Sequence, residues 1–532
     1  MDALLLAVVG AAVFVTAVAR HFNLSSPLLL VVVGLVLGII PAIPDVTMGS
    51  DLVLFVLLPP LLWSAGLESS YLNMSRNART ISLLAVGLPL ATTIAVGVVA
   101  YQVVPQLSLA AAFTLGAIVA PPDAVSATAV GRRLGLPRRL MTLLTGESLL
   151  NDATALTAYK VALSAAIGAT VSWGDGLAVF ALAAIGGVLT GLALGSLLVA
   201  VRTRLTDPLA ESAIGLVAPF AIYLAAELVN GSGVVAVVTA ALIGGQRFTR
   251  AHYATRLQDR AVWHAVQLLL ESFAFLMIGL QLPTVIGNLH ASSFAALTGA
   301  SLAVLAVVLG TRIVWVWLFA YLPQRLSARI REREPALPFA QVAVLAWAGM
   351  RGVVSLAAAF GVPVLTLSGA NFPGRPQLVF LTFVVVVGTL LLHGLTLPWL
   401  IRRLGAYGDE ARTDAIVAAT AQDKAARAAS KRLDELLATT EPSTQTERAA
   451  EVLRTLNTRR RNAARERLRR QTSNDTFLDE SLSETFRRLR LEMLATERAT
   501  FIAERDSGQI DDQVLRKLLH ALDLEEAALD LD

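Results

Sequence analysis

A short segment, residues 147–154, combines a carboxylate, a hydroxyl and an amide at a spacing that suits cation binding. On a helix, Ser148 lies one turn before Asp152, and Glu147 lies one turn before Asn151, so these polar side chains project toward one sector. Their oxygens are hard donors of the kind that small cations prefer. A polar seam that merely joins helices is the alternative, although Ser and Asn alone would serve that purpose at lower cost. The segment therefore predicts a monovalent cation site at Asp152.

A second acid, Asp123, directly follows Pro121 and Pro122 inside an apolar stretch. Two prolines remove backbone donors and break a helix. Inside a membrane, broken helices are buried or line a cavity, and transporters use them to bring carbonyl groups and helix ends to an ion. A proline kink without ion contact is the alternative. We interpret Asp123 as a second residue of the ion site.

Two arginines also lie inside apolar stretches. Arg351 stands between Gly349 and Gly352, which suggests a second helix break. A buried guanidinium needs a compensating partner, and Glu147 is our candidate for a structural ion pair with Arg351. Glu271 and Arg312 lie in neighbouring apolar stretches and are expected to form a second buried pair, mainly structural.

The composition shows that these charges must be positioned by membrane helices. Of the 532 residues, 55% are hydrophobic and 16% are charged, whereas an average soluble domain has about 25% charged residues. This excludes a soluble enzyme, a DNA-binding protein and a disordered scaffold. Cysteine is absent, which excludes thiolate metal sites and disulfides. The apolar N-terminus lacks a basic region and a cleavage site, so we expect a retained helix.

A membrane-spanning helix needs about 20 mostly apolar residues. We predict an all-α polytopic membrane protein with about thirteen such spans. The predicted spans cover about 3–19, 26–42, 50–67, 81–103, 107–130, 138–168, 176–201, 209–229, 231–245, 262–283, 293–322, 337–365 and 377–403.

The arginines predict how these spans are oriented. Alternate loops carry 19 arginines, and the loops of the opposite side carry one, Arg375. By the positive-inside rule the arginine-rich side is cytoplasmic. With an odd number of spans, the N-terminus is then outside and the C-terminal tail is in the cytoplasm.

The charge balance also predicts two domains. Residues 1–403 carry 23 Lys and Arg against 15 Asp and Glu, whereas residues 404–532 carry 21 against 25. The second region has helical spacing, many charges and no phosphate loop or metal cluster. We predict a helical cytoplasmic tail for dimer contacts or regulation, without a nucleic-acid role.

Several motifs together resemble the sodium/proton exchanger branch of the monovalent cation–proton antiporters. They are residues 146–152 (GESLLND), 121–125 (PPDAV), 349–352 (GMRG), 57–63 (LLPPLLW) and Ala226-Glu227 followed by 232–236 (SGVVA). The resemblance covers roughly residues 1–403 and leaves the tail unmatched.

This resemblance implies a fold of inverted repeats with a mobile core, a dimerisation domain and usually a homodimer. It implies that spans five and twelve are the broken, crossing helices, and that Asp152 carries Na⁺ and H⁺ alternately with Asp123, Ser148 and Asn151 nearby. The Asn151-Asp152 pair marks the branch regarded as electroneutral. One departure is Ser64, where many relatives have an acid, and it leaves the choice between Na⁺ and K⁺ open.

The resemblance therefore implies a secondary antiporter of the cell membrane that exchanges Na⁺ for H⁺, without a cofactor. K⁺/H⁺ exchange, or another substrate on the same fold, is the main alternative. A membrane-embedded enzyme and a receptor or channel are remote alternatives. The sequence contains no Gly-x-Ser-x-Gly motif, no metal-ligand trio near these residues and no repeated filter motif.

Overall fold

The chain divides into two compact units, Met1–Gly408 and Asp409–Asp532, in a computed structural model. The structure describes residues 2–22, 24–40, 50–169, 173–205, 207–247, 253–287, 294–326, 337–408, 410–439, 443–472, 482–507, 509–510 and 512–531. Within these ranges both units are helical, and the only β-type pairing is an isolated bridge between Leu365 and Asn371. The predicted all-α class is confirmed.

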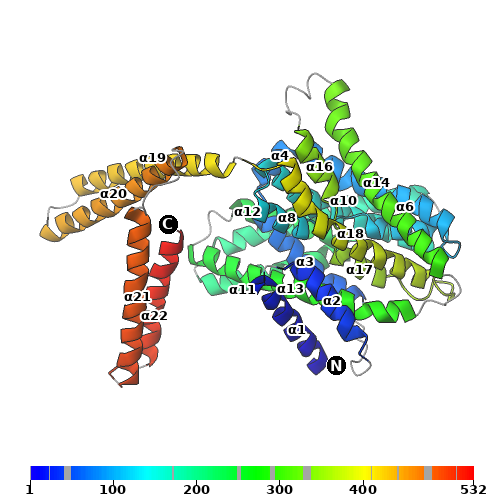
Figure 1. Cartoon of the computed structure of the whole chain (residues 1–532), viewed down its shortest axis with the longest axis horizontal. Helices are drawn as coiled ribbons and strands as arrows, with labels where there is room; N and C mark the ends of the chain where they lie inside the picture. Colours follow the sequence, from blue (N-terminus) through cyan, green and yellow to red (C-terminus); the bar gives the residue numbers. More distant parts are fainter. Residues whose placement is uncertain are drawn as a thin grey trace. The chain divides into compact units, whose positions relative to one another are not determined.

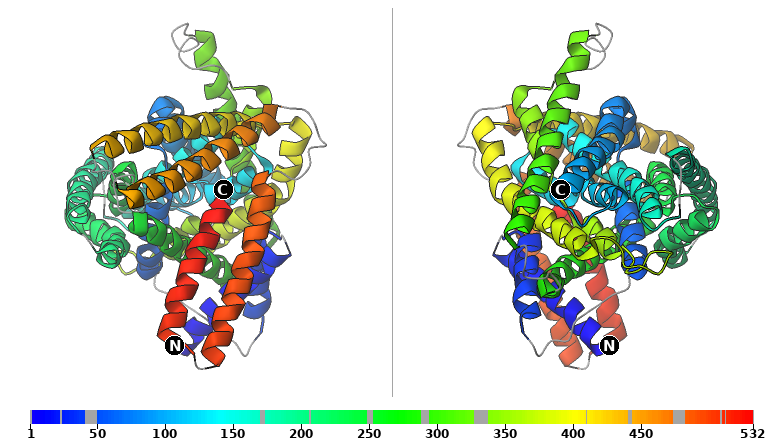
Figure 2. Two further views of the ribbon diagram at one scale, coloured as in Figure 1. Left: turned by 90° about the vertical axis from the view of Figure 1, so that its left-hand side faces the viewer. Right: turned by 90° about the vertical axis from the view of Figure 1, so that its right-hand side faces the viewer.

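The first unit is a bundle of helices (Figures 1 and 2). In chain order its helices are α1 (Asp2–His21), α2 (Ser26–Gly38), α3 (Ser50–Glu68), α4 (Tyr71–Arg76), α5 (Ala78–Ser82), the π-helical turn η1 (Leu83–Gly87), α6 (Leu88–Val103), α7 (Leu109–Val119), α8 (Ala124–Leu134), α9 (Arg138–Ala166), α10 (Trp173–Arg202), α11 (Pro208–Leu228), α12 (Gly233–Arg247), α13 (Tyr253–Gly287), α14 (Phe294–Leu326), α16 (Phe339–Trp347), α17 (Val353–Phe360) and α18 (Arg375–Leu404).

Six stretches of the described residues are long and apolar enough to cross a membrane, judged by length and composition. They are Ala78–Val103, Ala178–Arg202, Pro208–Leu228, Ala254–Gly287, Ala296–Leu326 and Arg375–Leu404. Shorter apolar helices accompany them, among them α2 and α7. Several apolar helices are thus present, as the composition predicted. The predicted spans 26–42 and 293–322 extend beyond the described residues, as do Arg250, Arg329, Arg331 and Arg333, which contribute to the predicted orientation.

Small residues allow helices of this unit to approach closely. Where α2 crosses α13, a β-carbon added to Gly34 would lie 2.3 Å from the carbonyl oxygen of Leu276, and one added to Gly279 would lie 2.2 Å from that of Val31. Only glycine leaves room for such backbone contact. The crossing therefore fixes α13 against α2, which is relevant to the polar residues that α13 carries.

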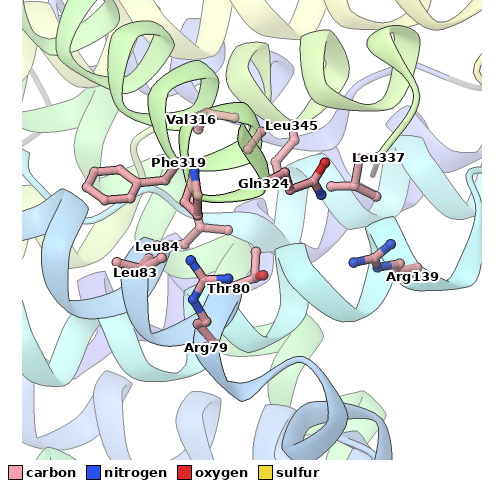
Figure 3. Close-up of a pocket in the computed structure, with 12 residues that line it drawn as sticks. Arg79, Thr80, Leu83, Leu84, Arg139, Val316, Phe319, Gln324, Leu337 and Leu345 are labelled. Carbon is pink, nitrogen blue, oxygen red and sulfur yellow. The ribbon is translucent and has the colours of Figure 1, made fainter. Parts of the chain in front are cut away.

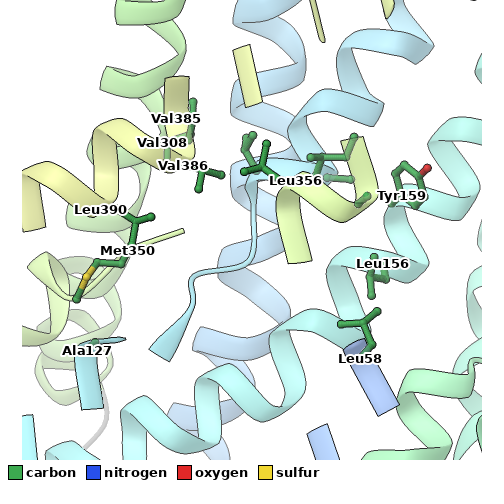
Figure 4. Close-up of a cluster of buried hydrophobic side chains, with 14 of the residues drawn as sticks. Leu58, Ala127, Leu156, Tyr159, Val308, Met350, Leu356, Val385, Val386 and Leu390 are labelled. Carbon is green, nitrogen blue, oxygen red and sulfur yellow. The ribbon is translucent and has the colours of Figure 1, made fainter. Parts of the chain in front are cut away.

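Two short non-helical segments among the described residues, the two helix interruptions, contain candidate site residues. Residues 120–123 separate α7 from α8, and residues 348–352 separate α16 from α17. Buried apolar side chains from α3, α9, α14, α17 and α18 pack in this region, including Met350 beside Leu390 (Figure 4). The interruptions therefore lie inside the packed core.

The second unit consists of two helical hairpins. Helix α19 (Glu410–Thr439) packs along α20 (Thr444–Thr472), and α21 (Leu482–Asp506) packs along α22 (Asp512–Leu531) (Figures 1 and 2). Partly exposed ion pairs join the helices of each hairpin, such as Arg461 with Asp423 at 3.1 Å and Arg490 with Glu525 at 2.8 Å. Charged residues at helical spacing therefore build the tail's own contacts.

Candidate ion-binding site

Helix α9 carries the first group of candidate residues. Pro137 precedes its first residue, a favourable helix start because proline has no N–H to leave unsatisfied. Glu147 and Asn151 are buried, whereas Ser148 and Asp152 are half-buried. The one-turn spacing of these residues therefore gives two buried and two more accessible polar positions along α9.

The two helix interruptions meet beside α9. The backbone N–H of Asp123 donates to the carbonyl oxygen of Met350 at 2.7 Å, which joins the first interruption to the second. The side-chain amide of Asn151 donates to the carbonyl oxygen of Pro122 at 2.9 Å, which joins the first interruption to α9. Because proline breaks the helix at 121–122, this carbonyl is available to accept a side-chain donor.

Gly352 allows Asp123 to approach the start of α17. A β-carbon added to Gly352 would lie 2.6 Å from Cβ and 2.8 Å from Oδ2 of Asp123. Gly352 is the N-cap residue of α17, and the first N–H groups of a helix favour a nearby negative charge. The second interruption thus provides both space and a favourable field for the Asp123 carboxylate.

Three of the predicted site residues come together at this junction. The carboxylates of Asp123 and Asp152 lie within electrostatic reach of each other. Asn151 is fully buried, and its side-chain oxygen has no hydrogen-bond donor among the residues that the structure describes. A buried acceptor without a donor is costly in a protein interior. Two carboxylates next to such an oxygen form an arrangement that a cation would satisfy.

The predicted pairing of Glu147 with Arg351 is wrong. The Glu147 carboxylate instead accepts from both terminal nitrogens of Arg312, with 3.0 Å between Nη2 and Oε2, and both residues are 1% exposed. Nη2 of Arg312 also donates to the carbonyl oxygen of Leu345 at 3.1 Å. The pair therefore connects α9, α14 and α16.

Arg351 is compensated by backbone carbonyls. Its Nε donates to Val119 at 2.9 Å and its Nη2 to Ala120 at 3.3 Å, and its Nη1 donates to Gly349. The last carbonyls of a helix have no partner within the helix and form the negative end of its dipole. The interruption after α7 exposes such carbonyls, so the buried guanidinium is satisfied without a carboxylate bond.

The predicted pairing of Glu271 with Arg312 is also wrong. Glu271 on α13 accepts a hydrogen bond from the side-chain amide of Gln267 at 2.7 Å, while Arg312 on α14 is bound to Glu147. Helix α13 packs against α1, α2 and α3, and α14 packs against α6, α16 and α18. Although α13 and α14 follow each other in the chain, their main packing partners differ, so Glu271 does not meet Arg312.

Two further polar residues near the second interruption were missed in the sequence. Thr389 on α18 accepts from the backbone N–H of Arg351 at 3.0 Å. His393, one turn later, is 1% exposed, and its ring lies edge-on to that of Trp347 at 5.2 Å between centroids. Their spacing on an apolar helix was the available signal, because polar residues one turn apart share a face.

A surface pocket lies apart from this junction. It is lined by Arg79, Leu84, Arg139, Phe319 and Gln324 among others, and none of Asp123, Asn151 or Asp152 lines it (Figure 3). Within the described residues there is also no group of three or more His, Asp or Glu side chains that could hold a metal ion. The candidate site is therefore the junction of α9 with the two helix interruptions.

Comparison with known proteins decides the family. The model of the family described as "Sodium/hydrogen exchanger, transmembrane" matches residues 8–403, the region that contains both interruptions and α9. The chain belongs to this sodium/hydrogen exchanger family. It is therefore a multi-pass membrane transporter and not an enzyme.

Individual relatives agree with this family. A protein of Mycobacterium bovis named as a Na⁺/H⁺ exchanger is 34% identical, over 99% of this chain and 95% of its own length. One of Escherichia coli K12, also named as a Na⁺/H⁺ exchanger, is 30% identical over 96% of this chain and 94% of its own. A Bacillus subtilis protein named as a sodium, potassium, lithium and rubidium/H⁺ antiporter is 29% identical over 70% of this chain and 57% of its own.

The fold is similar to that of a solved exchanger. The sodium proton antiporter MjNhaP1 from Methanocaldococcus jannaschii superposes with a TM-score of 0.60 at 19% identity, over 75% of this chain and 97% of its own. At this identity the likeness concerns the fold. Sodium/hydrogen exchangers thus share both sequence and architecture with the first unit.

Proposed function

We propose that this chain exchanges Na⁺ for H⁺ across the cell membrane at one site centred on Asp152. The observation that carries the proposal is the junction of α9 with the two helix interruptions. There the buried oxygen of Asn151 has no donor among the described residues, and the carboxylates of Asp123 and Asp152 interact. A carboxylate binds either a proton or a cation at a given time, so competition at Asp152 is sufficient for exchange.

Each neighbouring residue has a distinct part in this proposal. Asp152 carries the exchanged ion, and Asp123 adds negative charge and an oxygen ligand. Asn151 uses its amide to hold the Pro122 carbonyl, which leaves its oxygen for the cation. Ser148, one turn before Asp152 on α9, adds a hydroxyl ligand. The Glu147–Arg312 pair holds α9 against α14 and α16, and Arg351 holds the end of α7.

The same proposal includes an architecture for transport. Thirteen spans in inverted repeats would place the interrupted helices α7/α8 and α16/α17 as the crossing pair. Alternating access would move a core that contains α9 against a dimerisation domain within a homodimer. The arginine pattern supports an N-terminus outside and a cytoplasmic tail. The tail would have a regulatory role.

The direct test uses everted membrane vesicles that contain a pH-sensitive dye. Adding Na⁺ should release protons from vesicles with the wild-type chain. Asp152→Asn, which keeps the shape of the side chain but loses its charge, should abolish the response while the protein still inserts. Glu227→Gln, which removes a carboxylate near the C-terminal end of α11, is the matched control and should retain the response. Exchange by purified Asp152→Asn at a wild-type rate would refute the proposal.

The transported cation needs a separate measurement. The Bacillus subtilis relative is named for four cations, and Ser64 stands where many exchangers have an acid, so K⁺ is a second candidate. We expect Na⁺ and Li⁺ to give the larger dye response, because compact carboxylate sites favour small ions. A response to K⁺ that exceeds the response to Na⁺ would establish K⁺/H⁺ exchange instead.

We further propose that exchange is electroneutral, because position 151 is Asn and Asp152 alone carries the exchanged charge. A potential of 100 mV is worth about 2.3 kcal/mol for each charge that crosses. In proteoliposomes with a K⁺/valinomycin potential, the Na⁺ and H⁺ gradients at equilibrium should be independent of voltage. A voltage-dependent reversal point would contradict this, and Asp123 would then be the first residue to neutralise.

A further inference from the structure

Two polar stripes face each other between α3 and α13. On α3, Ser64 and Glu68 lie four residues apart, and on α13, His264, Gln267 and Glu271 follow at intervals of three and four. Such spacing places each set on one face of its helix. The two helices pack against each other, and α3 also packs against α9 and α17. The stripes therefore run beside the candidate ion site.

Polar contacts connect the stripes at two levels. At the outer level, Oε1 of Glu68 lies 3.3 Å from Nε2 of His264, and the two side chains are 44% and 60% exposed. Nη2 of Arg132, at the end of α8, lies 3.5 Å from Oε2 of the same glutamate. This end of the stripes is open to solvent.

At the inner level the contacts are partly buried. The Ser64 hydroxyl, on a residue that is 3% exposed, donates to the side-chain oxygen of Gln267 at 3.3 Å. The amide of Gln267 then donates to Oε1 of Glu271 at 2.7 Å. Polar groups thus continue from the exposed carboxylate of Glu68 to the inner carboxylate of Glu271.

Glu271 is the unexplained member of this series. The structure gives it one hydrogen bond, and within the described ranges no ion pair of Glu271 is found. A carboxylate inside a membrane domain is costly, and such residues mark ion pathways. Its charge lies within electrostatic reach of Asp123 and of Arg20 at the end of α1.

The depth of Glu271 also fits a position on the way to Asp152. Glu271 comes 11 residues after Arg260, which corresponds to about 16 Å along α13. Asp152 comes 13 residues after Arg139, which corresponds to about 20 Å along α9. Measured from the arginine-rich side, Glu271 is therefore reached first.

We propose that Glu271 is a transient cation-binding residue on the route between the solvent-exposed Glu68 and Asp152. This inference rests on the proposed cation/proton exchange and adds the path by which the cation arrives from the side of the tail. A negative charge in a narrow, weakly solvated passage raises the local concentration of cations. Ser64 and Gln267 hold the carboxylate in position and offer oxygens to the passing ion.

The test measures the apparent KM for Na⁺ from each side of the membrane. Everted and right-side-out vesicles are distinguished by protease access to the tail. Glu271→Gln should raise the KM about tenfold when Na⁺ is added on the tail side, the lower end of what a charged cleft contributes. The maximal rate and the KM from the opposite side should change less than about twofold. Glu271→Asp keeps the charge and should restore most of the affinity.

A structural role for Glu271 gives a different pattern. It predicts a lower melting temperature, a lower maximal rate and equal effects on the KM from both sides, and that pattern would overturn the inference. Glu227→Gln is the control, because Glu227 lies on α11, outside both stripes, and pairs with Lys160 at 2.7 Å. If Glu271→Gln does not fold, Gln267→Met retains the test. Gln267→Met removes the hydrogen bond to Glu271 and should raise the tail-side KM by a smaller factor.

The outcomes separate this inference from the proposal on which it rests. Wild-type protein that moves no protons when Na⁺ is added would refute both. Wild-type exchange together with an unchanged tail-side KM in Glu271→Gln would refute the role of Glu271 alone.

Discussion

Two arginines of this protein, Arg312 in the first unit and Arg490 in the tail, are compensated in opposite ways. In the first unit Arg312 is 1% exposed and binds one carboxylate, that of Glu147. In the tail Arg490 remains partly exposed and contacts two carboxylates, those of Glu497 and Glu525. We expect the fold to depend more on the arginine with fewer carboxylate partners, because burial, and not the number of partners, sets the cost of losing a contact.

In the tail, hydrogen bonds from arginines lower the pKa values of acids that contact solvent. Hydrogen bonds from Arg461 and Arg427 lower the pKa of Asp423, and a hydrogen bond from Arg490 lowers the pKa of Glu525. In the unfolded tail these charged groups are solvated. Water and salt then replace much of the free energy of each ion pair. Numerous ion pairs in the tail therefore say less about stability than the buried pair of Glu147 with Arg312.

The largest effect should come from Arg312→Ala. Removal of the guanidinium leaves the buried Glu147 carboxylate without its partner, which costs about 3–5 kcal/mol. We expect a marked fall in the melting temperature of the detergent-solubilised protein, or a large loss of yield.

The double variant Glu147→Gln/Arg312→Gln provides the control. It removes both charges and should be less destabilised than the sum of the single variants Glu147→Gln and Arg312→Gln. Strict additivity would argue that the two side chains do not stabilise each other, and the contrast with the tail would then disappear.

A smaller effect should follow from Gly352→Ala at the second interruption. The added methyl would lie 2.6 Å from Cβ of Asp123, so this side chain must move. Overpacking of this kind costs about 1–3 kcal/mol, and displacement of a proposed ligand should raise the KM for Na⁺.

Gly310→Ala on α14 is a matched control, because an added β-carbon there meets no atom within 4 Å. If both alanine variants have the same KM for Na⁺ and the same melting temperature, the close approach of Asp123 to Gly352 does not contribute to ion binding or stability.

Part of this arrangement could be predicted from the sequence. The low charge content predicted an all-helical membrane unit, and the prolines before Asp123 and the glycines around Arg351 lie where the helical path is interrupted. A hydrogen bond joins Asn151 to the carbonyl of Pro122 beside the candidate site. The role of this site in ion binding stays a prediction. Helical periodicity places residues along one element, which is why the arrangement on α9 could be anticipated.

The ion pairs could not be assigned in the same way. Any buried arginine could in principle meet Glu147, and which one does so depends on how α14 packs against its neighbours. Arg351 was expected to need a carboxylate, yet carbonyls at the end of α7 satisfy it. The end of a helix leaves backbone carbonyls free to accept hydrogen bonds, and residue types in the sequence do not indicate which carbonyls these are.

Acid should affect the tail in a predictable direction. The pKa values of Asp423 and Glu525 are lowered in the folded state from ordinary values of 3.8 and 4.5. Their contributions to stability are therefore present above these ordinary values and are lost as the pH falls through the lower folded values.

Full-length protein equilibrated at several pH values and then given a short deuterium pulse at one fixed pH would measure this. Exchange in α19 to α22 should increase below about pH 4, near the ordinary pKa of these acids. Peptides of α2 and α18 in the same samples are the internal reference. Tail exchange that is constant down to pH 2 would show that these pairs do not stabilise the hairpins.

The smallest effect should come from Arg490→Ala in the tail. The variant loses the bonds to Glu525 at 2.8 and 2.9 Å and to Glu497 at 2.9 Å, more contacts with carboxylates than Arg312→Ala loses. Because these groups are solvated in the unfolded tail, we expect faster exchange confined to α21 and α22, with unchanged Na⁺/H⁺ exchange and an unchanged melting temperature of the first unit. The pKa of Glu525 should return toward its ordinary value, since Arg490 is the cause of its shift. A loss of stability as large as that of Arg312→Ala would mean that the number of carboxylate contacts, and not burial, determines the strength of an ion pair in this protein.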